Sequence, residues 1–188
     1  MNKIQRNQIL DYQSYDDKRS EIQKSIFEIK GPRRIHVGSY LTFLFENVDT
    51  LSYQVQEMMR VEKLVKEKDI QHEIDTYNEL LGGPGSLSAT LLIEIDDVEQ
   101  RKELLTEWID LPHKIYILCS DQSKVYAKFD HRQIGDSRLS SVQYLMFELE
   151  DKAPIAIGSD HPDVTVESHF TDEQLKALTQ DLEASKSL

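Results

Sequence analysis

The chain has 188 residues, of which 39% are hydrophobic and 30% charged, a composition typical of a single globular domain. It excludes the disordered, collagen-like and disulfide-rich classes of protein. The 34 acidic residues outnumber the 22 basic ones and produce a net charge of -12, which repels a phosphate backbone, so we expect no nucleic-acid partner. The single cysteine, Cys119, excludes an internal disulfide and fits a reducing compartment.

No targeting or membrane segment is expected. The N-terminal sequence MNKIQRNQIL is polar and lacks the apolar run of a secretory signal. The densest apolar cluster, YLTFLF at 40–45, is far shorter than the roughly 18–20 residues that span a bilayer. We therefore expect a cytosolic protein with no membrane partner.

The N-terminal half of the chain predicts three helices and one strand region. The polar residues 1–12 are a candidate for disorder. In chain order we expect a helix over 15–30 ended by Gly31-Pro32, a bent or two-part strand over 33–47, a helix from a cap at Asp49 or Thr50 to about Glu67, and a helix over about 70–81 that ends at the glycine-rich loop 82–85.

Strands dominate the second half. We expect a strand over 86–95, a helix over 97–109 capped by Asp96 or Asp97, strands over 114–120 and 124–130 joined by a hairpin at Asp121-Gln122, strands over 141–149 and 164–170, and a last helix over about 171–184 capped by Thr171. Strands that follow one another, with helices grouped at both ends, are typical of the α+β class. We therefore predict one domain over 1–188, with a largely antiparallel sheet of five or six strands packed by helices.

The negative charge is concentrated near the C-terminus. From Glu148 to Leu188, ten residues are acidic and three are basic, so this segment carries -7 of the total -12. A solvated acidic tail helix accounts for this charge, and an acidic docking surface is the alternative.

The helix expected over 50–67 has an acidic residue within its apolar stripe. At 100° per residue, Leu51, Val55, Met58 and Val65 share one face, and Glu62 falls in the middle of that face. A buried, ionised carboxylate is unfavourable by roughly several kcal/mol unless a cation, a metal or hydrogen-bond donors compensate it.

Three interpretations of Glu62 stay open. It could form a buried ion pair with Arg33 or Arg34, the only adjacent arginines in the chain. The helix could instead be rotated so that Glu62 is exposed. The third interpretation is a metal-binding or catalytic carboxylate, whose pKa burial would raise enough for general acid or base work.

The opposite side of the same helix is polar. Tyr53, Gln56, Glu57 and Arg60 fall within about 100° of arc. Glu57 and Arg60 have the i,i+3 spacing of a helical salt bridge.

Two polar residues, Glu46 and Asn47, end the strand that precedes this helix. Glu46 could therefore lie near the start of the helix. A capping role for either residue is the simplest interpretation, and a contribution to a polar site is the alternative.

No strong catalytic or metal-binding motif occurs. None of the six histidines has a metal-ligand spacing, and the absence of Glu-x-x-His excludes a ferritin-like centre. Asp160 and His161 lie in the turn-like sequence GSDHPD, where they could supply a ligand or a general base, although a structural role is more common for such a histidine. Cys119 falls in an expected strand, where a small buried side chain is the simplest role.

The most distinctive segment of the chain is 33–63. It contains an Arg-Arg pair, a Val-Gly step, the run LTFLFEN, Thr50, the run YQVQEM and an Arg-x-Glu sequence. This pattern resembles a bacterial family catalogued as a domain of unknown function, number 3501. The resemblance continues through ATLLIEI, KVYAKFD, SSVQYLMFEL and GSDHPD, and so covers most of the chain from about residue 30.

The resemblance implies a compact cytosolic bacterial protein but no activity. Members of this family are often encoded near rubrerythrin-like and iron–sulfur heterodisulfide-reductase-like proteins. The resemblance therefore implies an accessory role in redox or peroxide defence, with those proteins as partners. It implies no cofactor for the chain itself.

Two hypotheses follow. The first is a non-catalytic accessory or interaction protein of such a redox system. The second is a small-molecule- or metal-binding protein, or an enzyme, with a carboxylate-rich site built from the 46–62 segment and with iron or another divalent metal as an alternative cofactor. The candidate site residues are Arg33, Arg34, His36, Glu46, Asn47, Tyr53, Gln54, Glu57, Arg60, Glu62, Asp160 and His161.

Overall fold

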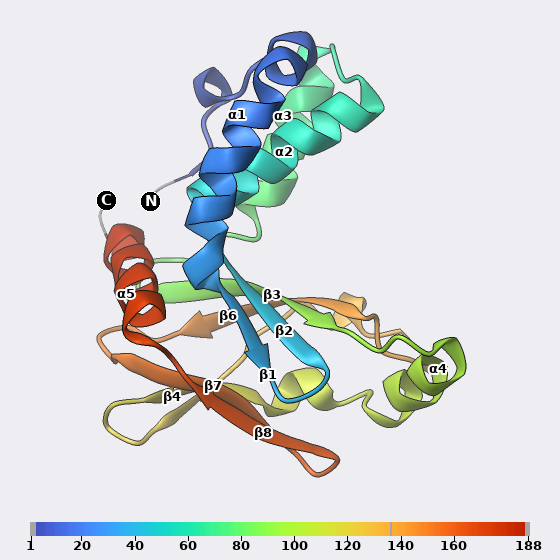
Figure 1. Cartoon of the computed structure of the whole chain (residues 1–188), viewed down its shortest axis with the longest axis vertical. Coiled ribbons are helices and arrows are strands. Elements are labelled where there is room, and N and C mark those ends of the chain that lie inside the picture. The colour runs from blue at the N-terminus through green and yellow to red at the C-terminus, as the bar shows by residue number, and fades with distance from the viewer. Residues whose placement is uncertain (1–2, 136, 187–188) are drawn as a thin grey trace.

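The computed structural model describes residues 3–135 and 137–186, which form five α-helices and eight β-strands (Figure 1). The helices are α1 (Tyr12–Lys30), α2 (Val48–Glu62), α3 (Glu67–Asn78), α4 (Val98–Glu107) and α5 (Asp172–Lys186). The strands are β1 (Arg34–Val37), β2 (Leu41–Glu46), β3 (Ser86–Ile93), β4 (Ile115–Cys119), β5 (Lys124–Tyr126), β6 (Val142–Glu148), β7 (Pro154–His161) and β8 (Val164–His169). The predicted α+β class is confirmed. No helix among these residues is long and apolar enough to cross a bilayer.

The strands form two antiparallel sheets of four, where the sequence pattern predicted one sheet of five or six strands. The first sheet has the order β1-β2-β3-β6 and the second has the order β5-β4-β7-β8. The strand that sequence analysis missed is β7, whose last residues are the GSDH of the turn-like GSDHPD. Only Pro162 and Asp163 separate the paired residues His161 and Val164, so the turn is tighter than the sequence suggested.

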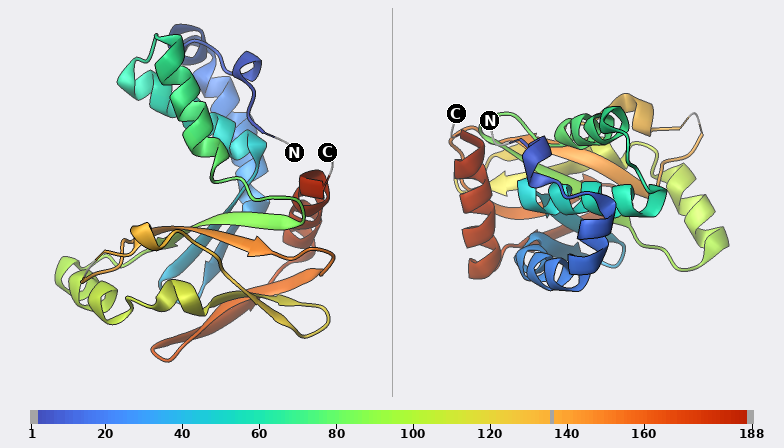
Figure 2. Two further views of the ribbon diagram at one scale, coloured as in Figure 1. Left: turned by 180° about the vertical axis from the view of Figure 1, so that it is seen from behind. Right: turned by 90° about the horizontal axis from the view of Figure 1, so that it is seen from above.

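The two sheets pack face to face around one large apolar core. Phe43 and Phe45 enter it from β2 with 0% and 2% of their surface exposed, and Ile115 and Ile117 enter it from β4 fully buried. The period-two alternation of these apolar residues determines which face of each strand is inside. Two views show α4 and α5 at opposite ends of this pair of sheets (Figure 1 and Figure 2).

Helices α1, α2 and α3 form a separate layer that stands on the outer side of the first sheet (Figure 2). This layer has its own small core, to which the N-terminal segment contributes: Ile4, Ile9, Leu51, Val55, Met59, Ile70 and Ile74. The prediction of disorder over 1–12 is therefore wrong for residues 3–12, the last of which begins α1; residues 1–2 lie outside the described residues. Buried Gln56 contacts this segment through both the N–H and the C=O of Leu10, at 2.8 and 3.0 Å.

Helix α2 ends five residues before the predicted boundary. Lys63 adopts a left-handed conformation with a φ of 52°, and the N–H of Leu64 donates to the carbonyl of Met59, which ends the helix at Glu62. Val65, which helical spacing placed on the buried stripe, is 71% exposed as a result.

Candidate functional site

The junction between β2 and α2 positions Glu46. The side chain of Asn47 accepts a hydrogen bond from the Thr50 N–H at 3.0 Å, and the Thr50 hydroxyl accepts one from the Asn47 N–H at 2.9 Å. The predicted capping role of Asn47 is confirmed by this reciprocal pair. Because the strand ends and the helix begins within one residue, Glu46 lies at the N-terminal end of α2, where the helix dipole favours a negative charge.

Glu46 is a buried carboxylate held by neutral donors. Its Oε1 accepts hydrogen bonds from the Thr90 hydroxyl at 2.9 Å and the Gln54 amide at 3.1 Å, and its Oε2 accepts one from the Thr50 hydroxyl at 2.6 Å. The side chain belongs to a residue only 7% exposed, and no lysine or arginine of the described chain forms an ion pair with it. An ionised carboxylate has about four acceptor positions, so Oε2 retains capacity for one more donor.

Ser88 lies directly across the sheet from Glu46. The two residues are paired in the β2–β3 register, so their side chains leave the same face of the sheet at neighbouring positions. Ser88 is 5% exposed, and its hydroxyl has no hydrogen-bond partner among the residues that the structure describes. The approach of Gly82 encloses this hydroxyl, since a Cβ at Gly82 would lie 3.2 Å from Ser88 Oγ and 2.7 Å from Ser86 Cβ.

Glu46 and Ser88 share a cavity of about 270 Å³, which we call the Glu46 pocket. It lies between the start of α2, the start of β3 and the C-terminal part of α5. The polar residues that line it are Gln8, Glu46, Asn47, Asp49, Ser86, Ser88, Asp181 and Ser185. Three of these residues are acidic and none is basic, so the wall of the pocket is negative.

The rim of the pocket is fixed by an ion pair between distant parts of the chain. Arg33 donates to both carboxylate oxygens of Asp181, at 2.7 and 2.9 Å, and its remaining nitrogen donates to the carbonyl of Ile29. The Asn47 amide also donates to Asp181, at 3.1 Å. The charge of Asp181 is therefore compensated within the protein, whereas that of Glu46 is not.

Tyr53, Glu57 and Arg60 point to α1 and away from the Glu46 pocket. Glu57 accepts hydrogen bonds from Arg19 at 2.8 and 3.0 Å and from the Tyr15 hydroxyl at 2.5 Å. The Arg19 hydrogen bonds are the main reason that the pKa of Glu57 falls to about 2. Burial, followed by the contact with Glu57, raises the pKa of Tyr15. This cluster joins α1 to α2, with the expected Glu57–Arg60 pair present at 3.4 Å.

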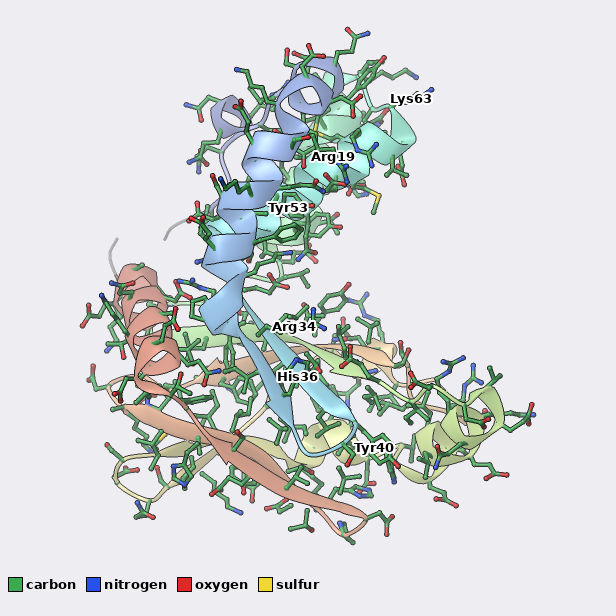
Figure 3. All side chains as sticks on the ribbon, in the orientation of Figure 1. Arg19, Arg34, His36, Tyr40, Tyr53 and Lys63 are labelled. Carbon is green, nitrogen blue, oxygen red and sulfur yellow. The ribbon has the colours of Figure 1, made fainter. Side chains whose placement is uncertain are left out.

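Arg34 and His36 lie on β1, away from the helical layer that carries Arg19 and Tyr53 (Figure 3). His36 Nδ1 is 2.8 Å from the Thr42 hydroxyl, which in turn donates to Glu94. Arg34 also contacts Glu94, at 3.4 Å. His36 is thus engaged in a mostly exposed polar chain and does not converge with Glu46, Glu57 or Glu62.

Asp160 and His161 are neighbours in β7 and point to opposite faces of the second sheet. His161 is 3% exposed; its Nδ1 accepts the Asp163 N–H, so its Nε2 carries the proton and donates to Asp110 at 3.0 Å. Asp160 accepts from the Tyr126 hydroxyl, which is the largest cause of its lowered pKa. The two side chains therefore do not form one ligand set or one acid–base pair.

Glu62 is exposed in the last turn of α2, which corrects the expectation that it is buried in an apolar stripe. The apolar stripe presupposed a helix to about residue 67, whereas the helix ends at Glu62 and its last buried residue is Met59. The ion pair with Arg33 or Arg34 is absent as well, since those residues contact Asp181 and Glu94. Of the three interpretations of Glu62, exposure is the one that the structure supports.

The predicted 46–62 site therefore separates into two parts: of its candidate residues, Glu46 and Asn47 line the pocket, and Gln54 reaches it only through its hydrogen bond to Glu46. Sequence reasoning missed Thr50 as a partner of Glu46 within this segment, and it missed the residues that other segments contribute: Ser86, Ser88, Thr90 and Asp181. A signal for three of them was present, because SLSAT alternates polar and apolar residues along β3. Within residues 3–135 and 137–186, no group of three or more histidine, cysteine, aspartate or glutamate side chains could hold a metal ion.

Comparison with known proteins identifies relatives but no activity. A solved structure from Burkholderia pseudomallei, described as a novel protein of unknown function, is 29% identical and has a TM-score of 0.89; the match covers 96% of this chain and 100% of that one. No curated protein matches the chain. Residues 3–182 match the family described as "Protein of unknown function (DUF3501)". The chain therefore belongs to the DUF3501 family, as the resemblance of its 33–63 segment predicts.

Proposed function

We propose that this protein binds a small organic cation, of the ammonium class, in the Glu46 pocket. The observation that carries the proposal is the buried Ser88 hydroxyl, which lies on the pocket wall opposite the Glu46 carboxylate; within residues 3–135 and 137–186 the hydroxyl has no hydrogen-bond partner and the carboxylate has no counter-ion. An ammonium group carries up to three donors, so one ligand nitrogen could donate to both Glu46 Oε2 and Ser88 Oγ.

The negative charge of the pocket favours a ligand with a positive charge. Glu46 and Asp49 line it without a basic residue, and the one charge that an arginine compensates is Asp181. An anion would meet Glu46 at close range in a partly desolvated pocket, where like charges repel most strongly. The volume of about 270 Å³ is slightly below the roughly 300–1,000 Å³ of typical ligand pockets, which favours a small ligand.

Ser88→Ala separates a binding role from a structural one. Ser88 Oγ has no partner to lose, and an unsatisfied buried hydroxyl is unfavourable by about 1–3 kcal/mol, so we expect the variant to be as stable as the wild type or more stable. Ser159→Ala is the matched control, because Ser159 is 1% exposed and its hydroxyl accepts the His161 N–H. We expect it to lower the free energy of unfolding by about 1 kcal/mol in urea titrations.

Ligand binding is tested with ethanolamine and 1,4-diaminobutane as cationic probes and acetate as the anionic comparison, by titration calorimetry. We expect binding of a cationic probe, no binding of acetate, and a loss of at least about tenfold in affinity in Glu46→Gln, which removes the charge and keeps the side-chain volume. Ser88→Ala should lower the affinity for the same probe, whereas Ser159→Ala should leave that affinity unchanged. Equal affinity of the wild type and Glu46→Gln for the cations would contradict the proposal.

The family resemblance supports a second proposal, an accessory role beside rubrerythrin-like or iron–sulfur proteins of a redox system. Its only support in this chain is the acidic C-terminal segment, which would suit a basic partner surface. Co-purification of the tagged protein from a native extract, identified by mass spectrometry, tests it; recovery of the chain without any such partner would contradict it.

A further inference from the structure

We infer that the opposite end of the molecule holds a second site, for a small organic phosphate. The site is a cavity of about 550 Å³ between α4 and the segment that leads into β6, which we call the basic pocket. The residues that carry the argument are Arg101, Lys102, Arg132, Arg138, Ser140 and Ser141. Figure 1 shows α4 at the far end of the sheets from α5, and therefore from the Glu46 pocket.

The sign of the charge in this pocket is unusual for the protein. Four basic residues line it and none of the described residues that line it is acidic, although the chain as a whole has a net charge of -12. Two of the four, Lys102 and Arg138, form no ion pair with any described residue. Their mutual repulsion, in a chain with an excess of 12 carboxylates, is relieved if an anion binds between them.

The other two basic residues contact groups of the protein itself. Arg132 contacts Asp130 through two nitrogens, the nearer pair of atoms being 2.5 Å apart. Arg101 donates one nitrogen to the carbonyl of Ile95 at 3.1 Å, which leaves the rest of its guanidinium available. A planar guanidinium matches two oxygens of a phosphate group at once, so a positioned arginine is well suited to this ligand.

A backbone hydrogen bond joins the two sides of the basic pocket. Part of the pocket wall is apolar. The N–H of Leu139 donates to the carbonyl of Leu105 at 2.8 Å, which attaches the 138–141 segment to the end of α4. Leu105, Leu139 and the 62% exposed Val98 line the cavity beside the basic side chains. A ligand that fills 550 Å³ would therefore place an anionic group on the arginines and an organic body on this apolar wall.

A phosphate fits this charge pattern better than a single carboxylate. A phosphate monoester carries about -1.5 to -2 charges at neutral pH and three acceptor oxygens, whereas a carboxylate carries one charge and two oxygens. Three available cations, Arg101, Lys102 and Arg138, together with the hydroxyls of Ser140 and Ser141, offer more donors than one carboxylate can use.

The experiment uses inorganic pyrophosphate as the probe and citrate as an anion of similar charge that contains no phosphate. Both are titrated into the full chain by calorimetry, and pyrophosphate is also titrated into ¹⁵N-labelled protein by NMR. We expect pyrophosphate to bind at least about tenfold more tightly than citrate and to shift the amide signals of Arg101, Lys102 and 138–141. Glu46→Gln should leave pyrophosphate binding unchanged. The test of the basic pocket is therefore independent of the test of the proposed cation site.

The decisive variant is the double substitution Lys102→Glu with Arg138→Glu, since both residues are exposed and form no ion pair with a described residue, so their replacement should not disturb folding. Its control is Lys66→Glu with Lys68→Glu near the start of α3, which changes the net charge equally far from the basic pocket. We expect the Lys102→Glu/Arg138→Glu variant to lower the affinity for pyrophosphate at least about tenfold, and the Lys66→Glu/Lys68→Glu control to lower it less than about twofold. Equal weakening by both, citrate binding as tight as pyrophosphate, or amide shifts spread over the surface would each overturn the inference.

Discussion

Replacing Arg33 with Met is expected to lower the free energy of unfolding by about 3–5 kcal/mol. The Arg33 and Asp181 side chains are only 10% and 12% exposed. They form a bidentate ion pair, with N···O distances of 2.7 Å from Nε to Oδ2 and 2.9 Å from Nη2 to Oδ1. Removing the guanidinium leaves the carboxylate of Asp181 buried, with the Asn47 amide as its remaining donor among the described residues and no cation beside it. It also leaves the carbonyl of Ile29, at the end of α1, without its side-chain donor.

This effect is measured by urea denaturation followed by circular dichroism. The control is Lys186→Met, because the Lys186–Asp151 ion pair is on the surface, with Asp151 99% exposed, and should contribute no more than about 0.5 kcal/mol. The double variant Arg33→Met with Asp181→Leu should recover much of the lost stability, since it removes both charges instead of isolating one. A loss below about 1 kcal/mol in Arg33→Met would show that the pair is not a structural link.

Glu57→Gln is expected to lower the free energy of unfolding by about 1.5–3 kcal/mol at neutral pH, because it removes the charge that Arg19 and Tyr15 contact. The loss should depend on pH in a defined direction. The pKa of Glu57 is about 2 in the folded protein and its ordinary value is 4.5. The folded state thus favours the ionised form, so this stabilisation is fully present above about pH 4.5 and is lost as the pH falls from 4.5 to about 2.

The measurement is the difference in unfolding free energy between the wild type and Glu57→Gln at a series of pH values. We expect the difference to be constant from pH 7 to about 5 and to shrink steadily below pH 4.5. Glu62→Gln is the matched control on the same helix, because Glu62 is exposed and should show a difference close to zero at every pH. A Glu57→Gln difference that stays constant down to pH 2 would contradict the shifted pKa.

Secondary structure was the part of this protein most accessible to sequence reasoning. The stop at Gly31-Pro32, the cap at Asp97 and the hairpin at Asp121-Gln122 are local signals, and the structure contains all three features. The error at β7 is of a different kind. Pro162 and the polar residues before it predict a turn, but the pairing of β7 with β4 on one side and β8 on the other extends the strand into that segment.

In the candidate site, too, local sequence signals and long-range contacts give different information. Helical periodicity singled out Glu62, which is exposed, because periodicity says which residues share a face but not where the packing partner ends. Glu46 was a candidate with a capping role as its simplest interpretation. Its burial depends on Thr90, which is 44 residues away in the sequence.

The sequence by itself determined the α+β class, most helices and strands and the negative overall charge, since each depends on residue type and short spacing; for the start of α2 it left Glu46, Asn47, Asp49 and Thr50 open as capping residues. Only the tertiary structure decided that Ser88 lies opposite Glu46, that Arg33 compensates Asp181 and that the basic residues of α4 share a pocket with Arg132 and Arg138. The physical reason is that burial and electrostatic compensation depend on contacts between residues distant in sequence. Arg33 and Asp181, 148 positions apart, become neighbours only when the sheets and α5 have packed.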